Sequence, residues 1–122
     1  MNTFDKFYET FKLNKNNCKN LGSYFAERFL SKSSEDELAS YRARLIDDNF
    51  VLIMEDPDLV KCVNVFFEND LNIAESARNT FMHRNTFLKR VERIIELTGI
   101  DIRKFENAMV FKFLMIIYKL AN

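Results

Sequence analysis

Glycine and proline are scarce in this chain, with two glycines and one proline among its 122 residues. These two residues are the main interrupters of helices and the main builders of tight turns, so their scarcity leaves room only for short loops. A chain that is helical over most of its length satisfies this constraint. The predicted fold class is therefore all-α.

Cysteine and histidine are almost as rare, since Cys18, Cys62 and His83 are the whole set. Their spacing matches no metal-binding pattern, and we interpret both cysteines as reduced thiols of a cytosolic protein. The sequence also lacks a Ser/His/Asp order, a pair of carboxylates suited to acid–base chemistry and a glycine-rich phosphate loop. We expect no catalytic residue, no metal and no cofactor, and the chain is not expected to be an enzyme.

Long hydrophobic runs are absent as well. The longest apolar run, from Phe113 to Tyr118, is far too short to cross a bilayer, and no charged-then-apolar leader opens the sequence. Apolar residues make up 48% of the chain and charged residues 30%, which is typical of a soluble globular domain. We expect no membrane partner and a cytoplasmic location.

No charge of one sign dominates, because 18 basic and 18 acidic residues give a formal net charge of zero. Neutrality argues against a nucleic-acid partner, since phosphate contacts supply much of the affinity. The charges are unevenly spread, however, and seven basic residues lie between positions 78 and 104: Arg78, Arg84, Lys89, Arg90, Arg93, Arg103 and Lys104. This split can create a positive face on a neutral domain, although two solvated helix surfaces would give the same pattern.

Residues 1–56 are predicted to form a helical N-terminal region. Two stripes of apolar residues at helical spacing, and a third helix capped by Ser33 or Ser34 with Glu37, support this prediction. The apolar segment from Phe50 to Met54 is ambiguous between a helix end, an extended stretch and an irregular connector. The region is open to three roles: a dimerisation arm, a cover over the rest of the chain, or a sensor. The stripes are Phe4, Phe7, Tyr8 and Phe11, then Leu21, Tyr24, Phe25 and Phe29.

Residues 57–122 are predicted to form a second unit. Pro57 suits the first turn of a helix that ends near Asn69, and Gly99 is placed to close a later helix in a left-handed cap. A last helix, roughly from Phe105 to Leu120, is apolar almost all round. Such a helix is buried either by its own domain or by a partner chain.

Between these helices, residues 72–98 have the pattern of a helix-turn-helix. Asn72 is a good N-cap, and Glu75 stands where a capping-box carboxylate can reach back to it. A turn follows at Phe81 and Met82. The next helix, from about His83 to Thr98, has a periodic apolar face that leaves its basic residues for the outside.

The geometry of a helix-turn-helix assigns roles to these residues, because the start of the second helix enters the major groove of double-stranded DNA. Arg84 and Asn85 suit guanine and adenine edges, and Lys89 continues their face one turn later. We predict these three as base contacts. The predicted contacts to the DNA backbone are Asn72, His83, Thr86, Arg90 and Arg93.

The stretch NIAESA, FMHRNT and RVERIIELTGID, between Asn72 and Asp101, resembles the C-terminal helix-turn-helix of the PucR/CdaR group of bacterial transcription regulators. The resemblance covers about residues 57–120 and is strongest at His83–Thr86 and Glu92–Gly99. It implies a Fis-like helix arrangement with an extra C-terminal helix, and DNA-binding transcription control by dimers or higher oligomers. Members of this group usually carry a long sensory region before the helix-turn-helix, where this sequence has about fifty residues.

Two positions depart from the pattern of this group. Leu88 stands where the group commonly has arginine, which removes a DNA contact, and Thr80 stands where it commonly has leucine, which is expected to weaken packing. The resemblance therefore implies a DNA-binding segment with altered affinity or specificity.

Three functions are compatible with the sequence. The leading hypothesis is a sequence-specific transcriptional regulator of the bacterial cytoplasm, bound to the nucleoid and acting as a homodimer through its C-terminal helix, its N-terminal helices or both. The second is a Fis-like architectural protein that bends DNA. The third is a protein-interaction module that kept the fold.

Overall fold

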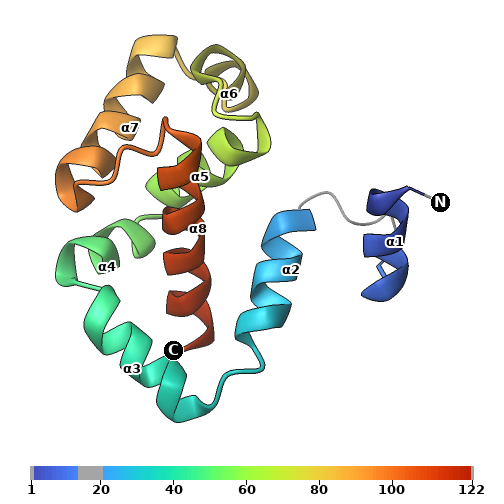
Figure 1. Cartoon of the computed structure of the whole chain (residues 1–122). Coiled ribbons are helices and arrows are strands. Elements are labelled where there is room, and N and C mark those ends of the chain that lie inside the picture. The colour runs from blue at the N-terminus through green and yellow to red at the C-terminus, as the bar shows by residue number, and fades with distance from the viewer. Residues whose placement is uncertain (1, 14–20, 122) are drawn as a thin grey trace.

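The computed structural model describes residues 2–13 and 21–121, and Cys18 lies outside these ranges. Within them the chain forms eight α-helices and no strand (Figure 1), which confirms the all-α prediction. The helices are α1 Thr3–Thr10, α2 Leu21–Leu30, α3 Glu35–Leu45, α4 Asp48–Met54, α5 Pro57–Glu68, α6 Ile73–Asn79, α7 Arg84–Thr98 and α8 Phe105–Leu120.

Polar side chains at the N-caps set where the central helices begin. The Oγ of Ser34 accepts a hydrogen bond from the Glu37 amide at 3.1 Å and starts α3, as predicted. Asp47 accepts from the Phe50 amide at 2.8 Å and starts α4, so the ambiguous segment from Phe50 to Met54 is a short helix of its own. Pro57 occupies the first turn of α5, and Asn69 caps its end, as predicted.

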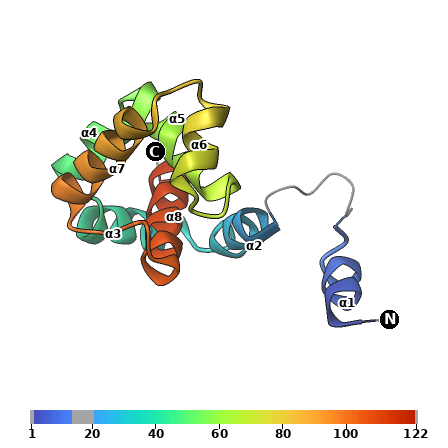
Figure 2. The same ribbon diagram turned by 90° about the horizontal axis from the view of Figure 1, so that it is seen from above.

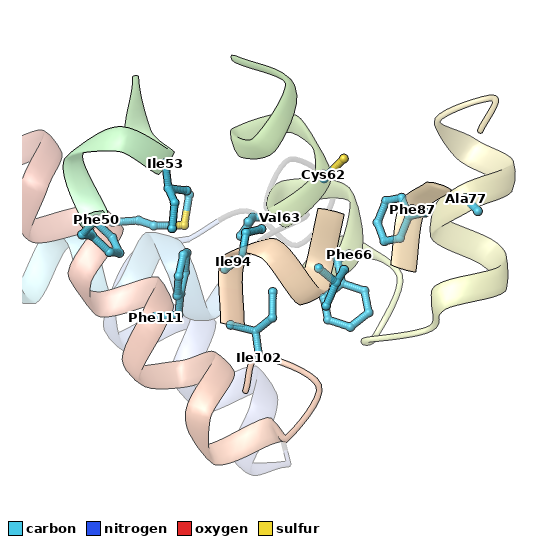
Figure 3. Close-up of a cluster of buried hydrophobic side chains, with 12 residues drawn as sticks. Phe50, Ile53, Cys62, Val63, Phe66, Ala77, Phe87, Ile94, Ile102 and Phe111 are labelled. Carbon is cyan, nitrogen blue, oxygen red and sulfur yellow. The ribbon is translucent and has the colours of Figure 1, made fainter. Parts of the chain in front are cut away.

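One hydrophobic core joins α4, α5, α6, α7 and α8 (Figure 3). Aromatic rings hold its centre: the Phe66 and Phe87 rings lie 6.1 Å apart, and the Phe50 and Phe111 rings lie 5.2 Å apart. Phe50 and Ile53 of α4 are therefore buried together with residues of α5 to α8. The division of the chain at residue 57 stays a prediction, and the core has members on both sides of it.

The N-terminal helices pack differently from the rest of the chain. α1 lies beside α2 and away from α3–α8 in both views (Figures 1 and 2), and the Phe25 ring lies 5.0 Å from Phe7 and 4.9 Å from Phe11. The predicted apolar stripe of α2 is only partly buried, because Tyr24 and Phe29 are exposed and the buried residue of that helix is Ala26. The buried residue of α2 is thus a small one, while the large side chains of the stripe stay at least partly accessible.

Polar contacts hold α2 and α3 along α8. Lys119 forms an ion pair with Glu27 of α2 at 3.1 Å. The Arg42 guanidinium of α3 donates to the Tyr118 carbonyl at 3.4 Å and lies 4.6 Å from the centre of the Tyr118 ring. The N-terminal region is thus attached to the C-terminal helix.

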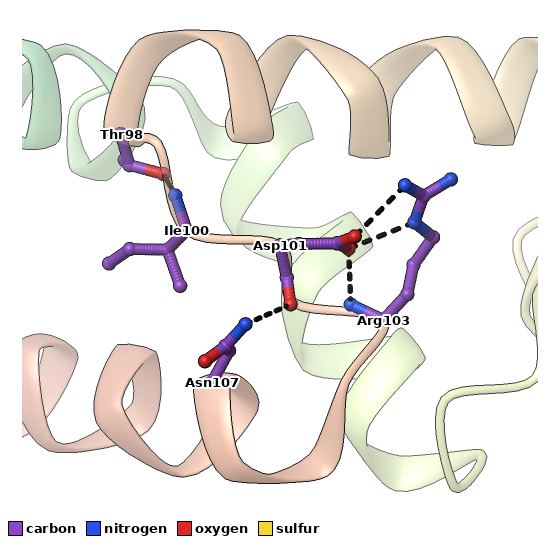
Figure 4. Close-up of polar contacts among 5 residues, drawn as sticks. All are labelled: Thr98, Ile100, Asp101, Arg103 and Asn107. Carbon is purple, nitrogen blue, oxygen red and sulfur yellow. Dashed lines mark hydrogen bonds and ion pairs between the residues drawn. The ribbon is translucent and has the colours of Figure 1, made fainter.

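The loop between α7 and α8 is organised by Asp101 (Figure 4). Arg103 donates to this carboxylate from its side chain at 2.9 and 3.0 Å and from its amide at 3.1 Å, while Asn107 donates to the Asp101 carbonyl at 3.2 Å. The loop turns the chain so that Ile102 enters the core fully buried. Asp101 therefore fixes how α8 leaves α7.

Asp101 is expected to titrate well below an ordinary carboxyl group. The side-chain hydrogen bond from Arg103 lowers its pKa from 3.8 to about 2. Because the folded pKa lies below the unfolded one, Asp101 stabilises the fold above about pH 4, and this contribution is lost as the pH falls toward 2. A carboxyl NMR titration checks the value, and Arg103→Ala should return it toward 3.8. A pKa near 3.8 in the unsubstituted chain would contradict this contact.

No helix in residues 2–13 or 21–121 is both long enough and apolar enough to span a membrane.

Candidate nucleic-acid interface

The first helix of the helix-turn-helix, α6, begins at Asn72 as predicted. The Oδ1 of Asn72 accepts a hydrogen bond from the Glu75 amide at 2.9 Å. The reciprocal half of the predicted capping box is absent, because the Glu75 carboxylate pairs with Arg78 at 2.7 Å and the Asn72 amide donates to the Asn69 carbonyl. Arg78 follows Glu75 by three residues on the exposed side of the helix, and it binds the carboxylate in place of the Asn72 amide.

Small and hydrogen-bonded residues bring α6 close to its neighbours. Ala77 and Ser76 are buried, and the Ser76 hydroxyl donates to the Asn72 carbonyl at 2.6 Å. Thr80 is also buried, and its hydroxyl donates to the Ser76 carbonyl at 2.8 Å and to the Ala77 carbonyl at 3.1 Å. A threonine at this position therefore has its polar atom satisfied inside the helix end, which removes most of the cost of burying it.

The turn between α6 and α7 places Phe81 in a conformation that favours glycine. Its φ is +55°, and the residue is 97% exposed. The Met82 amide donates to the Ala77 carbonyl at 2.9 Å, which closes the turn behind Phe81 and fixes this backbone. The turn was predicted at Phe81 and Met82, but its left-handed conformation and the full exposure of the phenyl ring were not.

Phe81→Gly is expected to stabilise the fold by up to about 1 kcal/mol. The left-handed conformation costs a side chain about 1–2 kcal/mol, while glycine increases the entropy of the unfolded chain and returns roughly half of that gain. The ring has no packing to lose, since it is exposed. Urea denaturation followed by circular dichroism measures the difference. A loss of stability larger than about 0.5 kcal/mol would show that the ring makes contacts in the folded chain.

The second helix, α7, is capped by His83. The Nδ1 of His83 accepts a hydrogen bond from the Asn85 amide at 3.2 Å, so the helix starts at Arg84 with the imidazole on the outside. At the other end Gly99 adopts a φ of +72° and its amide donates to the Ile95 carbonyl, as predicted for a left-handed cap. Both ends of α7 are thereby defined.

The buried face of α7 leaves most of the predicted DNA contacts on the surface. Phe87, Val91 and Ile94 are buried, as their spacing predicts. The exposed residues include all three predicted base contacts and four of the five predicted backbone contacts: Arg84, Asn85 and Lys89, then Asn72, His83, Thr86 and Arg93. The first turn of α7 contains no acidic residue, so the start of this helix presents no carboxylate that would repel a phosphate.

Arg90 differs from its expected outward position. It is half-buried, and its Nη1 lies 4.0 Å from the Sγ of Cys62 on α5. The reason is its place on the helix, three residues after Phe87 and next to Val91, at the margin of the buried face. Burial raises the pKa of the Cys62 thiol, and the nearby Arg90 counters part of that rise. Arg90 therefore helps to position α7 on α5.

Arg78 was counted among the basic residues but was not predicted as a contact. It lies in the last turn of α6, and its side chain is 69% exposed. The short connection between the two helices separates it from the start of α7 at Arg84. Its ion pair with Glu75 is exposed and therefore weak, so the guanidinium can exchange this partner for a phosphate. The sequence signal that could have identified Arg78 as a contact is its position immediately before the turn of the helix-turn-helix.

Comparisons with known proteins agree with this geometry. The profile of the PucR C-terminal helix-turn-helix domain matches residues 59–117, which confirms the resemblance predicted for about residues 57–120. The chain is 29% identical over 80 residues, 66% of its length, to the uncharacterized protein YxkF of Bacillus subtilis (strain 168), and covers 27% of that protein. It is 34% identical over 55 residues, 45% of its length, to the purine catabolism regulatory protein of the same strain, and covers 10% of it.

The chain thus spans about a quarter or less of the length of these curated relatives. No solved structure matches it.

Proposed function

Residues 59–117 match the profile of the PucR C-terminal helix-turn-helix domain, and on this premise we propose that the chain is a DNA-binding transcription regulator. In this proposal α7 lies in the major groove of its operator and reads the sequence. The observation that carries the proposal is the exposed first turn of α7, where Arg84 and Asn85 stand side by side without an acidic neighbour. A relative named as a purine catabolism regulatory protein is consistent with a regulatory role.

Base contacts are assigned to Arg84, Asn85 and Lys89. A guanidinium pairs bidentately with guanine and a carboxamide with adenine, and both groups project from the end of the helix that enters the groove. Lys89 follows Asn85 by one helical turn, so it faces the same side. These three side chains are exposed and are the ones that would discriminate between sequences.

Backbone contacts are assigned to Asn72, His83, Thr86, Arg90 and Arg93. Arg93 is exposed on the same side of α7, and His83 and Thr86 flank the start of the helix. The Oδ1 of Asn72 is engaged by the Glu75 amide, so its NH₂ group is the donor available to a phosphate. Arg90 is half-buried and its Nη1 lies 4.0 Å from the Sγ of Cys62, so in this assignment its guanidinium reaches a phosphate only by turning away from that contact.

The proposal includes a homodimer and a location on the nucleoid in the cytoplasm. One helix-turn-helix reads one half-site, and two copies related by two-fold symmetry read two half-sites about one helical turn apart, roughly 34 Å. The N-terminal region is attached to α8 by the Lys119–Glu27 and Arg42–Tyr118 contacts. Dimerisation, cover and sensing all remain roles that this region could serve.

Selection of bound duplexes from a random pool, followed by a salt titration on the selected duplex, tests the proposal. We expect a defined consensus and a slope of log K against log salt that gains about −0.9 for each phosphate neutralised. Equal affinity for random and selected duplexes would instead indicate an architectural protein. Absence of salt-dependent binding to any duplex would contradict a DNA-binding function and favour a protein-interaction module.

A further inference from the structure

Phe81, in the turn between α6 and α7, combines two properties that are each unfavourable for the folded chain. Its φ of +55° lies in the left-handed region, where a bulky side chain is disfavoured. The residue is 97% exposed, so its phenyl ring keeps nearly all of its apolar surface in water. Packing within the fold offsets neither of these costs.

Other residues with a positive φ show what accompanies this conformation elsewhere in the chain. Leu71 has a φ of +63°, and its side chain packs against the hydrophobic core. Asp70, with a φ of +55°, belongs to a residue type that tolerates the left-handed region. Lys12 has a φ of +54° and is exposed, but a charged side chain loses nothing in water. Phe81 has none of these compensations, and backbone outliers of this kind cluster at functional surfaces.

The turn that contains Phe81 lies beside the start of α7 and away from α2 and α3 (Figures 1 and 2). Phe81 precedes Arg84 by three residues. Consecutive Cα atoms are about 3.8 Å apart, so the Cα atoms of these two residues are separated by at most about 11 Å. One nucleotide step along a DNA strand is about 3.4 Å, and this separation therefore spans about three base steps. The ring is thus placed next to the base pair that the proposed function assigns to Arg84.

The segment that carries the ring is basic. Arg78 lies in the last turn of α6, before Phe81, and Arg84 begins α7 after it, and both arginines are exposed. Residues 76–91 contain no acidic residue. An apolar ring on a basic segment suits a partner that presents phosphates together with apolar groups. Double-stranded DNA has both, because its grooves display base edges between two rows of phosphates.

We propose that Phe81 is a specificity-determining residue whose ring contacts the C5-methyl group of a thymine in the major groove. This contact rests on the proposed function, because it requires the start of α7 to enter the groove. The thymine methyl is the apolar group that the major groove displays, and phenylalanine is among the residues that contact it. Arg84 and Asn85 recognise hydrogen-bonding edges, so the ring adds a preference for thymine over cytosine, which lacks the methyl group.

Phe81→Ala and Phe81→Gly test the contact in the full chain. We expect each variant to bind the selected operator at least about fivefold more weakly than the unsubstituted chain, because each loses the apolar area of the ring. The slope of log K against log salt should stay unchanged, since no phosphate contact is removed. Phe81→Gly is expected to be more stable than the unsubstituted chain, so weaker binding by this variant cannot result from unfolding.

Replacement of single thymines by deoxyuridine in the selected operator identifies the methyl group. We expect one sensitive thymine within about three base pairs of the position whose preference Arg84→Ala relaxes. Its replacement should weaken binding by the unsubstituted chain about three- to fourfold, the effect of one buried methyl group. Phe81→Ala should not respond to the same replacement. Fluorescence anisotropy at fixed salt on the four combinations of protein and duplex measures this coupling.

Phe29→Ala is the matched control, because Phe29 is 70% exposed on α2, which lies away from the turn (Figures 1 and 2). It should leave affinity within about twofold, since substitutions at distant sites act independently. Unchanged operator affinity of Phe81→Ala would overturn the proposed contact and leave the proposed function standing. Weaker binding without any coupled thymine would overturn the thymine assignment and place the ring against another part of the duplex. An unsubstituted chain that binds no duplex would contradict the proposed function, and the contact with it.

Discussion

Phe87→Ala is expected to destabilise the fold by about 3–5 kcal/mol, the usual cost of removing a buried phenyl ring. Phe87 is fully buried on the side of α7 that faces Phe66 of α5 and Ala77 of α6 (Figure 3), and the centres of the Phe66 and Phe87 rings lie 6.1 Å apart. A domain of this size has a total stability of about 5–15 kcal/mol, so the change consumes much of it.

The ring also connects stability to function, because Phe87 lies one turn after the exposed start of α7. A cavity beneath this turn would loosen the side chains that the proposal assigns to DNA. Urea denaturation measures the loss of stability, and DNA affinity at low temperature measures the effect on binding. Thr86→Ala is the matched control, since the neighbouring Thr86 is exposed and its removal should change stability by less than about 0.5 kcal/mol. A Phe87→Ala variant that loses less than about 1 kcal/mol would contradict the described core.

The helix-turn-helix was predictable because its signals are local. Asn72 and Gly99 act on their own backbone neighbours, and the spacing of Phe87, Val91 and Ile94 reports one buried face. None of these features depends on what lies elsewhere in the chain. The boundaries and the inward face of α7 were therefore fixed by short-range chemistry.

Features that depend on distant packing were not predictable in the same way. The segment from Phe50 to Met54 is too short for periodicity to identify, and it became a helix because Asp47 caps it and Phe50 and Ile53 fit the core. In α2 the buried residue is Ala26 rather than one of the aromatic residues, and the periodicity of the large side chains did not indicate this.

Residues at the margin of a buried face were the hardest to place. Arg90 could be assigned to the outside from its charge, yet it is half-buried and its Nη1 lies 4.0 Å from the Sγ of Cys62, because its position borders the buried face of α7. Phe81 shows the opposite case. An apolar residue is normally expected to be covered, but the turn requires its backbone position and leaves the ring in solvent.

Arg84→Ala is expected to weaken binding to the selected operator by about 1–3 kcal/mol, or roughly 5- to 150-fold, and to relax the preference at one base position. Arg84 is exposed in the first turn of α7, where removal of its side chain costs the fold little. Arg93→Ala should instead weaken binding to all sequences alike and reduce the steepness of the salt dependence by about one unit, because Arg93 is assigned to a phosphate. The contrast between two exposed arginines of one helix separates base reading from charge.

Fluorescence anisotropy at fixed salt, on the selected duplex and on duplexes with single base changes, measures both effects. Arg44→Ala is the control for loss of a positive charge, since Arg44 is exposed on α3, far from the start of α7 (Figure 1). It should leave affinity within about twofold of the unsubstituted chain, because most of the charge effect is screened beyond about 10 Å. If Arg84→Ala lowered the affinity for every sequence equally, Arg84 would be assigned to the DNA backbone instead of to a base. Unchanged affinity would show that the start of α7 does not enter the groove.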